Sequence, residues 1–148
     1  MIDGPGVASV ADAKPQVSNL LAVRDAVERA GYDATIVVDD DFAQLVDDPD
    51  ELARLVDAKI VKLSPKGMDA DYYVLEQCEA LGAIVVSNAS YDDQRGRYPW
   101  ISERRVPVTI AGGKAELDED AIRRVWSDDM VTEASKESFP ASDPPAYS

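Results

Sequence analysis

The sequence contains no histidine and only one cysteine among its 148 residues. Without histidine the chain cannot use Ser-His-Asp or Cys-His catalysis, a histidine general base, or a zinc site that includes histidine. Cys78 cannot form an internal disulfide, and its place in a helical apolar pattern favours a buried core residue over a nucleophile. Catalysis is therefore left mainly to carboxylates, tyrosine, lysine and metal ions held by oxygen.

Long apolar runs and a leader sequence are also missing. No stretch approaches the roughly 18 apolar residues that a membrane-spanning helix needs. The start lacks the basic region followed by an apolar one that marks a signal peptide. We therefore expect a cytoplasmic protein without a membrane partner. The chain is long enough for one domain with its own core, and its 45% apolar content fits that expectation.

Basic residues are scarce. The 15 lysines and arginines face 29 aspartates and glutamates, which gives a net charge of −14. Self-repulsion of this size is tolerable where salt screens it, and the composition resembles that of salt-adapted archaeal proteins. We therefore predict a halophilic protein whose acids mainly solvate the surface, rather than one that binds a cationic partner. The bulk charge opposes nucleic-acid binding at low salt.

Strand-like and helix-like segments alternate along the chain, which predicts an α/β fold with a parallel sheet and right-handed crossovers. We expect strands at residues 1–3, 35–38, 59–63, 83–86 and 106–110, and helices at 17–30, 49–57, 70–81 and 118–126. Gly4-Pro5-Gly6 reads as a turn, and 8–15 as a loop. The expected domain is 1–117, followed over 118–148 by a peripheral helix and a disordered acidic tail.

Acidic residues recur where the expected strands end and helices begin. Asp3 ends the first strand, Asp69 and Asp71 precede or open the helix that Gly82 closes, and Asp92 and Asp93 follow the strand at 83–86. In a parallel sheet these positions converge on one edge. Converging carboxylates repel one another unless a cation lies between them, and Mg²⁺ or Mn²⁺ suits such oxygen ligands.

A second acidic group, Asp39-Asp40-Asp41, follows the strand at 35–38. It has two interpretations, a metal site or a cap for the next segment, and we favour the cap because Asp is a preferred capping residue. A receiver-type signalling domain would also place acids after a strand. That hypothesis ranks last, because the usual arrangement of phosphoacceptor and lysine is not evident.

Two motifs and one further segment carry a resemblance to a known family. They are Ile2-Asp3-Gly4-x-x-Val7-Ala8, Ile84-Val85-Val86-Ser87-Asn88-x-x-Tyr91-x-Asp93 and the segment 95–105. Together they resemble the NYN branch of PIN-like ribonucleases, most closely the Regnase-type zinc-finger-associated ribonuclease domain, over residues 1–117. The resemblance implies a PIN-like three-layer α/β sandwich with a mostly parallel sheet, a Mg²⁺-dependent acidic centre and endonucleolytic cleavage of single-stranded RNA.

The resemblance implies roles for individual residues. Asp3, Asp71 and Asp93 match acids of the family and are the expected ligands of Mg²⁺ or Mn²⁺. Asn88 matches the family's Ser-Asn and joins the expected catalytic set. Asp69 is either a catalytic substitute for the first paired acid, whose position holds Ala70, or a helix cap.

Basic residues near the acidic centre are the expected RNA contacts. They are Lys66, Arg95, Arg97, Arg104 and Arg105, and guanidinium groups pair well with phosphate. Simple solvated charge is the alternative for the arginines. Tyr98 and Trp100 either stack on bases or, more commonly, pack against the domain.

Two positions depart from the family pattern. Gly6 stands where the family has Asn, and Ala89 stands where it has Asp. These departures support an alternative hypothesis, a catalytically degenerate PIN-like domain that binds RNA or a protein without cleaving. A homodimer is compatible with either hypothesis.

Overall fold

A computed structural model describes residues 1–8 and 15–125. Its centre is a sheet of five strands in the order β3-β2-β1-β4-β5, and every neighbouring pair is parallel. The strands are β1 (Ile2–Asp3), β2 (Ile36–Val38), β3 (Val61–Leu63), β4 (Val85–Val86) and β5 (Arg105–Val106). The predicted α/β fold with a mostly parallel central sheet is therefore confirmed.

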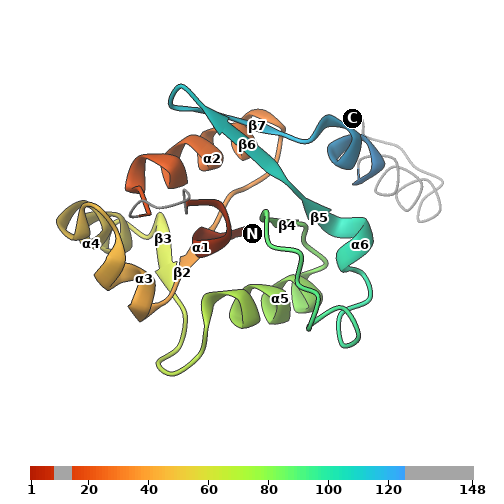
Figure 1. Ribbon diagram of the computed structural model, residues 1–148, viewed down its shortest axis with the longest axis horizontal. Helices are drawn as coiled ribbons and strands as arrows, with labels where there is room; N and C mark the ends of the chain where they lie inside the picture. Colours follow the sequence, from red (N-terminus) through yellow and green to blue (C-terminus); the bar gives the residue numbers. More distant parts are fainter. Residues whose placement is uncertain (9–14, 126–148) are drawn as a thin grey trace.

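Helices cover both faces of the sheet (Figure 1). They are α1 (Gly4–Ala8), α2 (Val17–Arg29), α3 (Asp40–Leu45), α4 (Pro49–Asp57), α5 (Ala70–Leu81) and α6 (Ile101–Arg104). Val37 belongs to the apolar cluster shared with α5 and α6, whereas Ile36 and Val38 belong to the cluster shared with α2, α3 and α4. Successive side chains of β2 thus fill two separate cores, as the alternation of a strand requires.

Local signals in the sequence set several helix ends as expected. The side chain of Asp48 accepts a hydrogen bond from the Glu51 backbone nitrogen, and Pro49 opens α4. Gly82 closes α5 in the left-handed conformation, with φ 67°. Asp118 accepts from the Ala121 nitrogen and starts a helical segment that is described over 119–125.

Two predicted elements are wrong in their form. Gly4 to Gly6 is not a simple turn but the start of α1, and the Gly6 nitrogen donates at 3.3 Å to the side chain of Asp3, the residue before the helix. The single strand expected at 106–110 is divided between two sheets. Its first part belongs to β5, and the rest is β6 (Val108–Ala111), which pairs antiparallel with β7 (Lys114–Leu117).

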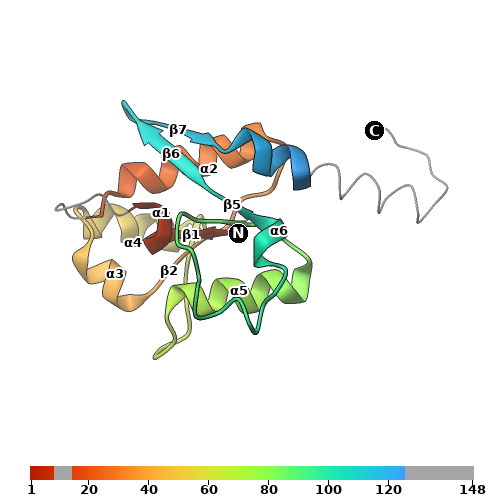
Figure 2. The ribbon, with the colours of Figure 1, turned by 45° about the vertical axis from the view of Figure 1, so that its right-hand side comes forward.

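The hairpin of β6 and β7 lies over α2 (Figures 1 and 2). Its two-residue turn is Gly112-Gly113, and both glycines have positive φ, 60° and 77°. Such turns favour glycine because side chains are strained there. Ala121 and Val125 in the helical segment beyond β7 are buried in the same core as α2.

No helix within the described residues is long and apolar enough to cross a membrane. Most of the loop expected at 8–15 and the tail expected from 127 lie outside the described residues.

Candidate active site

The site is built around Asp3, the last residue of the central strand β1. Its carboxylate is only 1% exposed, yet several donors surround it. Oδ2 accepts hydrogen bonds from the Tyr91 hydroxyl at 2.5 Å and the Ser87 hydroxyl at 3.4 Å, and Oδ1 accepts from the Gly6 nitrogen at 3.3 Å. The parallel register brings these groups together, because Ile2 of β1 aligns with Val86 of β4 and Ser87 follows directly.

The pKa of the Asp3 carboxyl is raised above its ordinary value. Burial is the largest cause, and the negative charge of Asp71 acts in the same direction. The hydrogen bonds from Tyr91, Gly6 and Ser87 oppose the shift because they stabilise the carboxylate. A buried acid with a raised pKa beside a second acid is typical of a functional site.

Asp71 lies in the first turn of α5 and is half-buried. Its Oδ2 accepts a hydrogen bond from the Gln94 side chain at 3.4 Å, and its Oδ1 accepts from the Tyr72 nitrogen at 2.7 Å. The negative charge of Asp71 acts on Asp3, and a shared role of the two acids stays a prediction.

Asp69 occupies the N-cap position of α5 but makes no capping hydrogen bond with its side chain, which is exposed. Asp39 supplies the cap from the end of β2. Its Oδ1 accepts from the Phe42 nitrogen of α3 at 2.8 Å, and its Oδ2 accepts from the Ala70 nitrogen of α5 at 3.1 Å. The predicted capping role of Asp39 is thus confirmed, and it extends to a second helix.

Asn88 is tied to the backbone on both sides. Its nitrogen donates to the Gly6 oxygen at 3.2 Å, and its side-chain oxygen accepts from the Val108 nitrogen at 2.8 Å. These bonds hold the loop after β4 against α1 and β6. The carboxamide oxygen therefore serves the loop, and a catalytic contribution from Asn88 stays a prediction.

Gly6 of α1 lies close to the groups that surround Asp3. A Cβ atom at Gly6 would lie 2.2 Å from the Ser87 hydroxyl and 3.0 Å from Asp3 Oδ2. A side chain there would displace the groups that hold Asp3. The close approach of α1 to the loop after β4 depends on glycine at this position.

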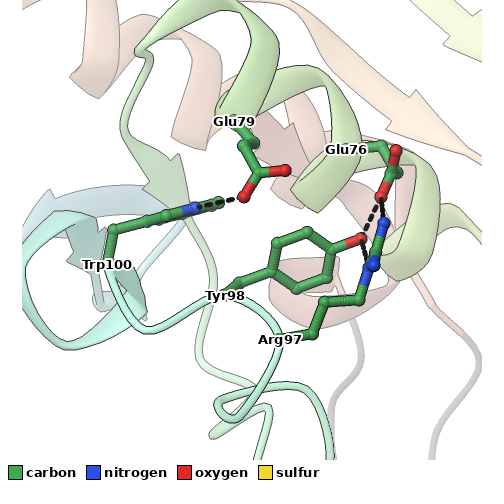
Figure 3. Close-up of polar contacts among 5 residues, drawn as sticks. All are labelled: Glu76, Glu79, Arg97, Tyr98 and Trp100. Atoms are coloured by element: carbon green, nitrogen blue, oxygen red, sulfur yellow. Dashed lines mark hydrogen bonds and ion pairs between the residues drawn. The ribbon is translucent and has the colours of Figure 1, made fainter.

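The segment after the site is anchored to α5 (Figure 3). Arg97 forms an ion pair with Glu76 at 2.9 Å, and the Tyr98 hydroxyl donates to the same carboxylate. The hydrogen bond from Tyr98, and then Arg97, lowers the pKa of Glu76. Tyr98 is fully buried and Trp100 donates to Glu79 at 3.4 Å. The packing interpretation of Tyr98 is confirmed, and Arg97 is engaged with an acid.

The other predicted RNA contacts have different surroundings. Arg104 lies over the Trp100 ring, 4.3 Å from its centroid. Arg95 donates to the Ser90 oxygen and the Ser102 hydroxyl, and Arg105 donates to the Ser87 oxygen. Lys66 is exposed in the loop before α5.

A model of the Zc3h12a-like ribonuclease NYN domain matches residues 1–128. The chain belongs to the Zc3h12a-like ribonuclease NYN domain family. A search of curated protein sequences finds no significant match.

Two solved structures of a plant enzyme share the fold of this NYN domain. One, Arabidopsis thaliana nuclear protein-only RNase P 2, has a TM-score of 0.63 and 16% identity, and the match covers 82% of this chain and 30% of that chain. The other, a crystal structure of nuclear proteinaceous RNase P 2 from A. thaliana, has a TM-score of 0.61 and 18% identity, with 78% and 28% covered. The chain thus spans less than a third of the length of these structures, and the likeness shows the fold.

NYN and PIN-like nucleases generally use divalent metal ions. Within the described residues, no three or more Asp, Glu, His or Cys side chains form a group that could hold a metal ion. Asp92 and Asp93 are exposed, and Asp93 as a third ligand stays a prediction. The Asp3 and Asp71 pair still fits Mg²⁺ or Mn²⁺, because Mg²⁺ takes one or two carboxylates and completes its shell with water and substrate phosphate. Burial, and to a lesser extent the charge of Asp71, raises the pKa of Asp3, and a bound cation would favour the charged carboxylate against both.

Sequence reasoning missed Tyr91, Ser87 and Gln94 as neighbours of the two acids. Ser87 and Tyr91 follow β4 within the motif that begins at Ile84. Their position just after a buried strand is the one signal that could have placed them at the site. Their hydrogen bonds with Asp3 span 84 and 88 positions of the chain. Such contacts depend on which strands are neighbours, and no local pattern gives that order.

Proposed function

We propose that this NYN domain is a Mg²⁺- or Mn²⁺-dependent endoribonuclease that cleaves single-stranded RNA. The observation that carries the proposal is the buried carboxylate of Asp3 at the end of the central strand, with Asp71 beside it. Membership of a ribonuclease family supports RNA as the substrate. Asp3 and Asp71 would hold the ion, and Asp93 and Asp69 are the candidates for further carboxylate contacts.

A bound divalent ion supplies charge stabilisation at the phosphate and a hydroxide-like water at neutral pH. The protein's own part is orientation. Tyr91, Ser87 and the Gly6 nitrogen fix the Asp3 carboxylate, and Gln94 fixes that of Asp71. Preorganised acids of this kind need little rearrangement when the substrate arrives.

The test is incubation of labelled single-stranded RNA with Mg²⁺, Mn²⁺ or EDTA, at low and at molar salt. Wild type should cleave with metal and not with EDTA. Asp3→Asn and Asp71→Asn should abolish cleavage, because the amide keeps the shape of the side chain and removes the charge that holds the cation. Asp33→Asn is the matched control. Asp33 is an exposed acid that precedes β2, at the amino ends of the parallel strands, whereas Asp3 lies at their carboxyl ends.

The second candidate function is binding of RNA or protein without cleavage. The observations that favour it are Ala70 and Ala89 at positions where the resemblance implies acids, and Gly6 packed against Ser87. RNA binding that survives EDTA, with no cleavage by wild type in either metal, would select this function over the enzyme.

A further inference from the structure

A hollow of about 300 Å³ lies beside the candidate active site and is lined by three arginines. Arg95 comes from the loop after the site, Arg105 from β5, and Arg124 from the helical segment 119–125. We call these three residues and the space between them the arginine hollow. Figure 2 shows the helical segment above β5 and α6, so the hollow joins parts of the chain that are distant in sequence.

The three guanidinium groups of the arginine hollow form no ion pair within the described part of the chain. Arg95 donates to the Ser90 oxygen at 2.9 Å and to the Ser102 hydroxyl at 2.7 Å, and Arg105 donates to the Ser87 oxygen at 3.1 Å. All of these acceptors are uncharged. Arg95, Arg105 and Arg124 form no ion pair with an acid of the described residues. Arg97 and Arg123, in contrast, each pair with an acid.

Two acids also line the hollow, but each has another partner. Asp118 accepts a hydrogen bond from the Ala121 nitrogen at 3.0 Å and so caps the helical segment. Asp120 pairs with Arg123 at 3.4 Å. Three guanidinium groups thus gather in one hollow although the chain has a net charge of −14. Guanidinium has five N–H donors, so Arg95 and Arg105 keep donors for an anion.

The arginine hollow is connected directly to the acidic centre. The Ser87 residue that binds the Arg105 guanidinium through its carbonyl also donates from its hydroxyl to Asp3. Arg95 binds the carbonyl of Ser90, the residue before Tyr91. An anion in the hollow would therefore lie against the loop after β4, which also contacts the carboxylate of Asp3.

We propose that the arginine hollow binds a backbone phosphate of single-stranded RNA next to the phosphate that is cleaved. The inference rests on the proposed function for its substrate. Guanidinium groups match phosphate oxygens in geometry and charge. Phosphate contacts position the strand and carry no base information, so the hollow contributes affinity at all sequences alike.

Arg124 and its neighbour Arg123 offer a matched pair of variants. Both are exposed on the same helical segment, and their replacement changes the net charge equally. Arg123 does not line the arginine hollow; it lines another hollow together with Glu119, and it pairs with Glu119 and with Asp120. Arg124→Gln should weaken RNA binding, whereas Arg123→Gln should not.

Binding is measured by fluorescence anisotropy of labelled single-stranded RNA with the full chain carrying Asp3→Asn, in EDTA, over a series of KCl concentrations. Losing one phosphate contact should lower the slope of log Kd against log salt by about 0.7. Arg124→Glu and Arg123→Glu repeat the comparison with reversed charge. Circular dichroism spectra confirm that each variant is folded.

The outcomes separate this inference from the proposed function. Equal affinities and equal salt slopes for the Arg124 and Arg123 variants would overturn the arginine hollow, even if wild type cleaves RNA. Weaker binding by the Arg124 variants alone supports the hollow, even if wild type does not cleave RNA and the enzyme proposal fails.

Discussion

The hydroxyl of Tyr91 donates a hydrogen bond to the carboxylate of Asp3 across 88 positions of sequence. Tyr91 is 4% exposed and has φ 56°, a left-handed conformation that is uncommon for a bulky residue. Burial, and then the charge of Asp3, raises the pKa of Tyr91, so the phenol stays protonated and keeps donating. Strained backbone of this kind concentrates at functional sites.

Tyr91→Phe removes that donor and leaves a buried carboxylate oxygen with one partner fewer. Loss of a buried partner costs about 1–3 kcal/mol, so urea unfolding should show a lower free energy of unfolding. Mn²⁺ affinity, measured by calorimetry, should rise because Oδ2 of Asp3 is released for the cation. Tyr72→Phe is the control, since Tyr72 is 45% exposed on α5. Equal stability of the two variants would show that the hydroxyl contributes nothing.

Local chemistry made the sheet, the main helices and several caps predictable from sequence. Asp48-Pro49 opens α4 and Gly82 ends α5, because capping depends on residues only a few positions apart. The hairpin was missed although Gly112-Gly113 is a strong signal for a two-residue turn. The strand at 106–110 reads as one apolar run, and nothing local shows that β5 and β6 belong to different sheets.

The candidate site was predictable only in part. The convergence of strand and helix ends at one edge of a parallel sheet predicts Asp3 and Asp71 near each other, and the charge of Asp71 does act on Asp3. The cap that Asp39 provides to two helices and the ion pair between Arg97 and Glu76 could not be predicted. Each joins separate elements, whose relative positions the sequence does not show. Charge alone does not tell a free arginine from one paired with an acid.

Glu76→Gln should destabilise the domain in a pH-dependent way. The Tyr98 hydrogen bond, followed by Arg97, lowers the folded-state pKa of Glu76 below its unfolded value. Its contribution to stability is therefore present above the unfolded pKa and is lost as pH falls through the folded pKa. The melting temperature of Glu76→Gln should lie below that of wild type at neutral pH, and the difference should vanish in acid.

Glu79→Gln is the control for that comparison, because Glu79 is an exposed acid on α5 whose carboxylate accepts only from Trp100. Thermal unfolding followed by circular dichroism across pH is the measurement. A constant difference between Glu76→Gln and wild type from neutral to acid pH would contradict the linkage.

Salt should stabilise the domain. The Debye length falls from about 10 Å at 0.1 M to about 3 Å at 1 M, so repulsion among 29 acids is screened. Screening also weakens ion pairs such as Arg29 with Asp25, but exposed pairs contribute only about 0–1 kcal/mol each. The melting temperature should therefore rise in molar KCl, and a flat or falling value would argue against a halophilic protein.

The segment after β7 should contribute to stability. We proposed from sequence that the domain ends near 117, whereas Ala121 and Val125 are buried in the core with α2. Burying a valine side chain is worth about 1.5–3 kcal/mol. A chain that ends at 117 should unfold at lower urea than one that ends at 128, and the latter should match the full chain. Equal midpoints for all three chains would place the boundary at 117.

Ala89→Asp tests whether the acidic centre lacks a ligand. Ala89 follows Asn88 in the loop after β4, and its backbone nitrogen donates at 3.1 Å to the Ser87 hydroxyl, which also contacts Asp3. Without metal, a third carboxylate adds repulsion and should lower the melting temperature. With Mn²⁺ the same carboxylate becomes a ligand, and a ligand that binds only the folded state raises stability with its concentration.

The Mn²⁺-dependent rise in melting temperature should therefore be larger for Ala89→Asp than for wild type, and cleavage of single-stranded RNA should be faster. Ser90→Asp adds the same charge at the exposed neighbouring position and should leave the Mn²⁺-dependent rise in melting temperature unchanged. If Ala89→Asp and wild type both leave RNA uncut with either metal, the enzyme proposal fails. Binding without cleavage then becomes the function that the site supports, because the acids of the site do not form a catalytic centre even with the added carboxylate.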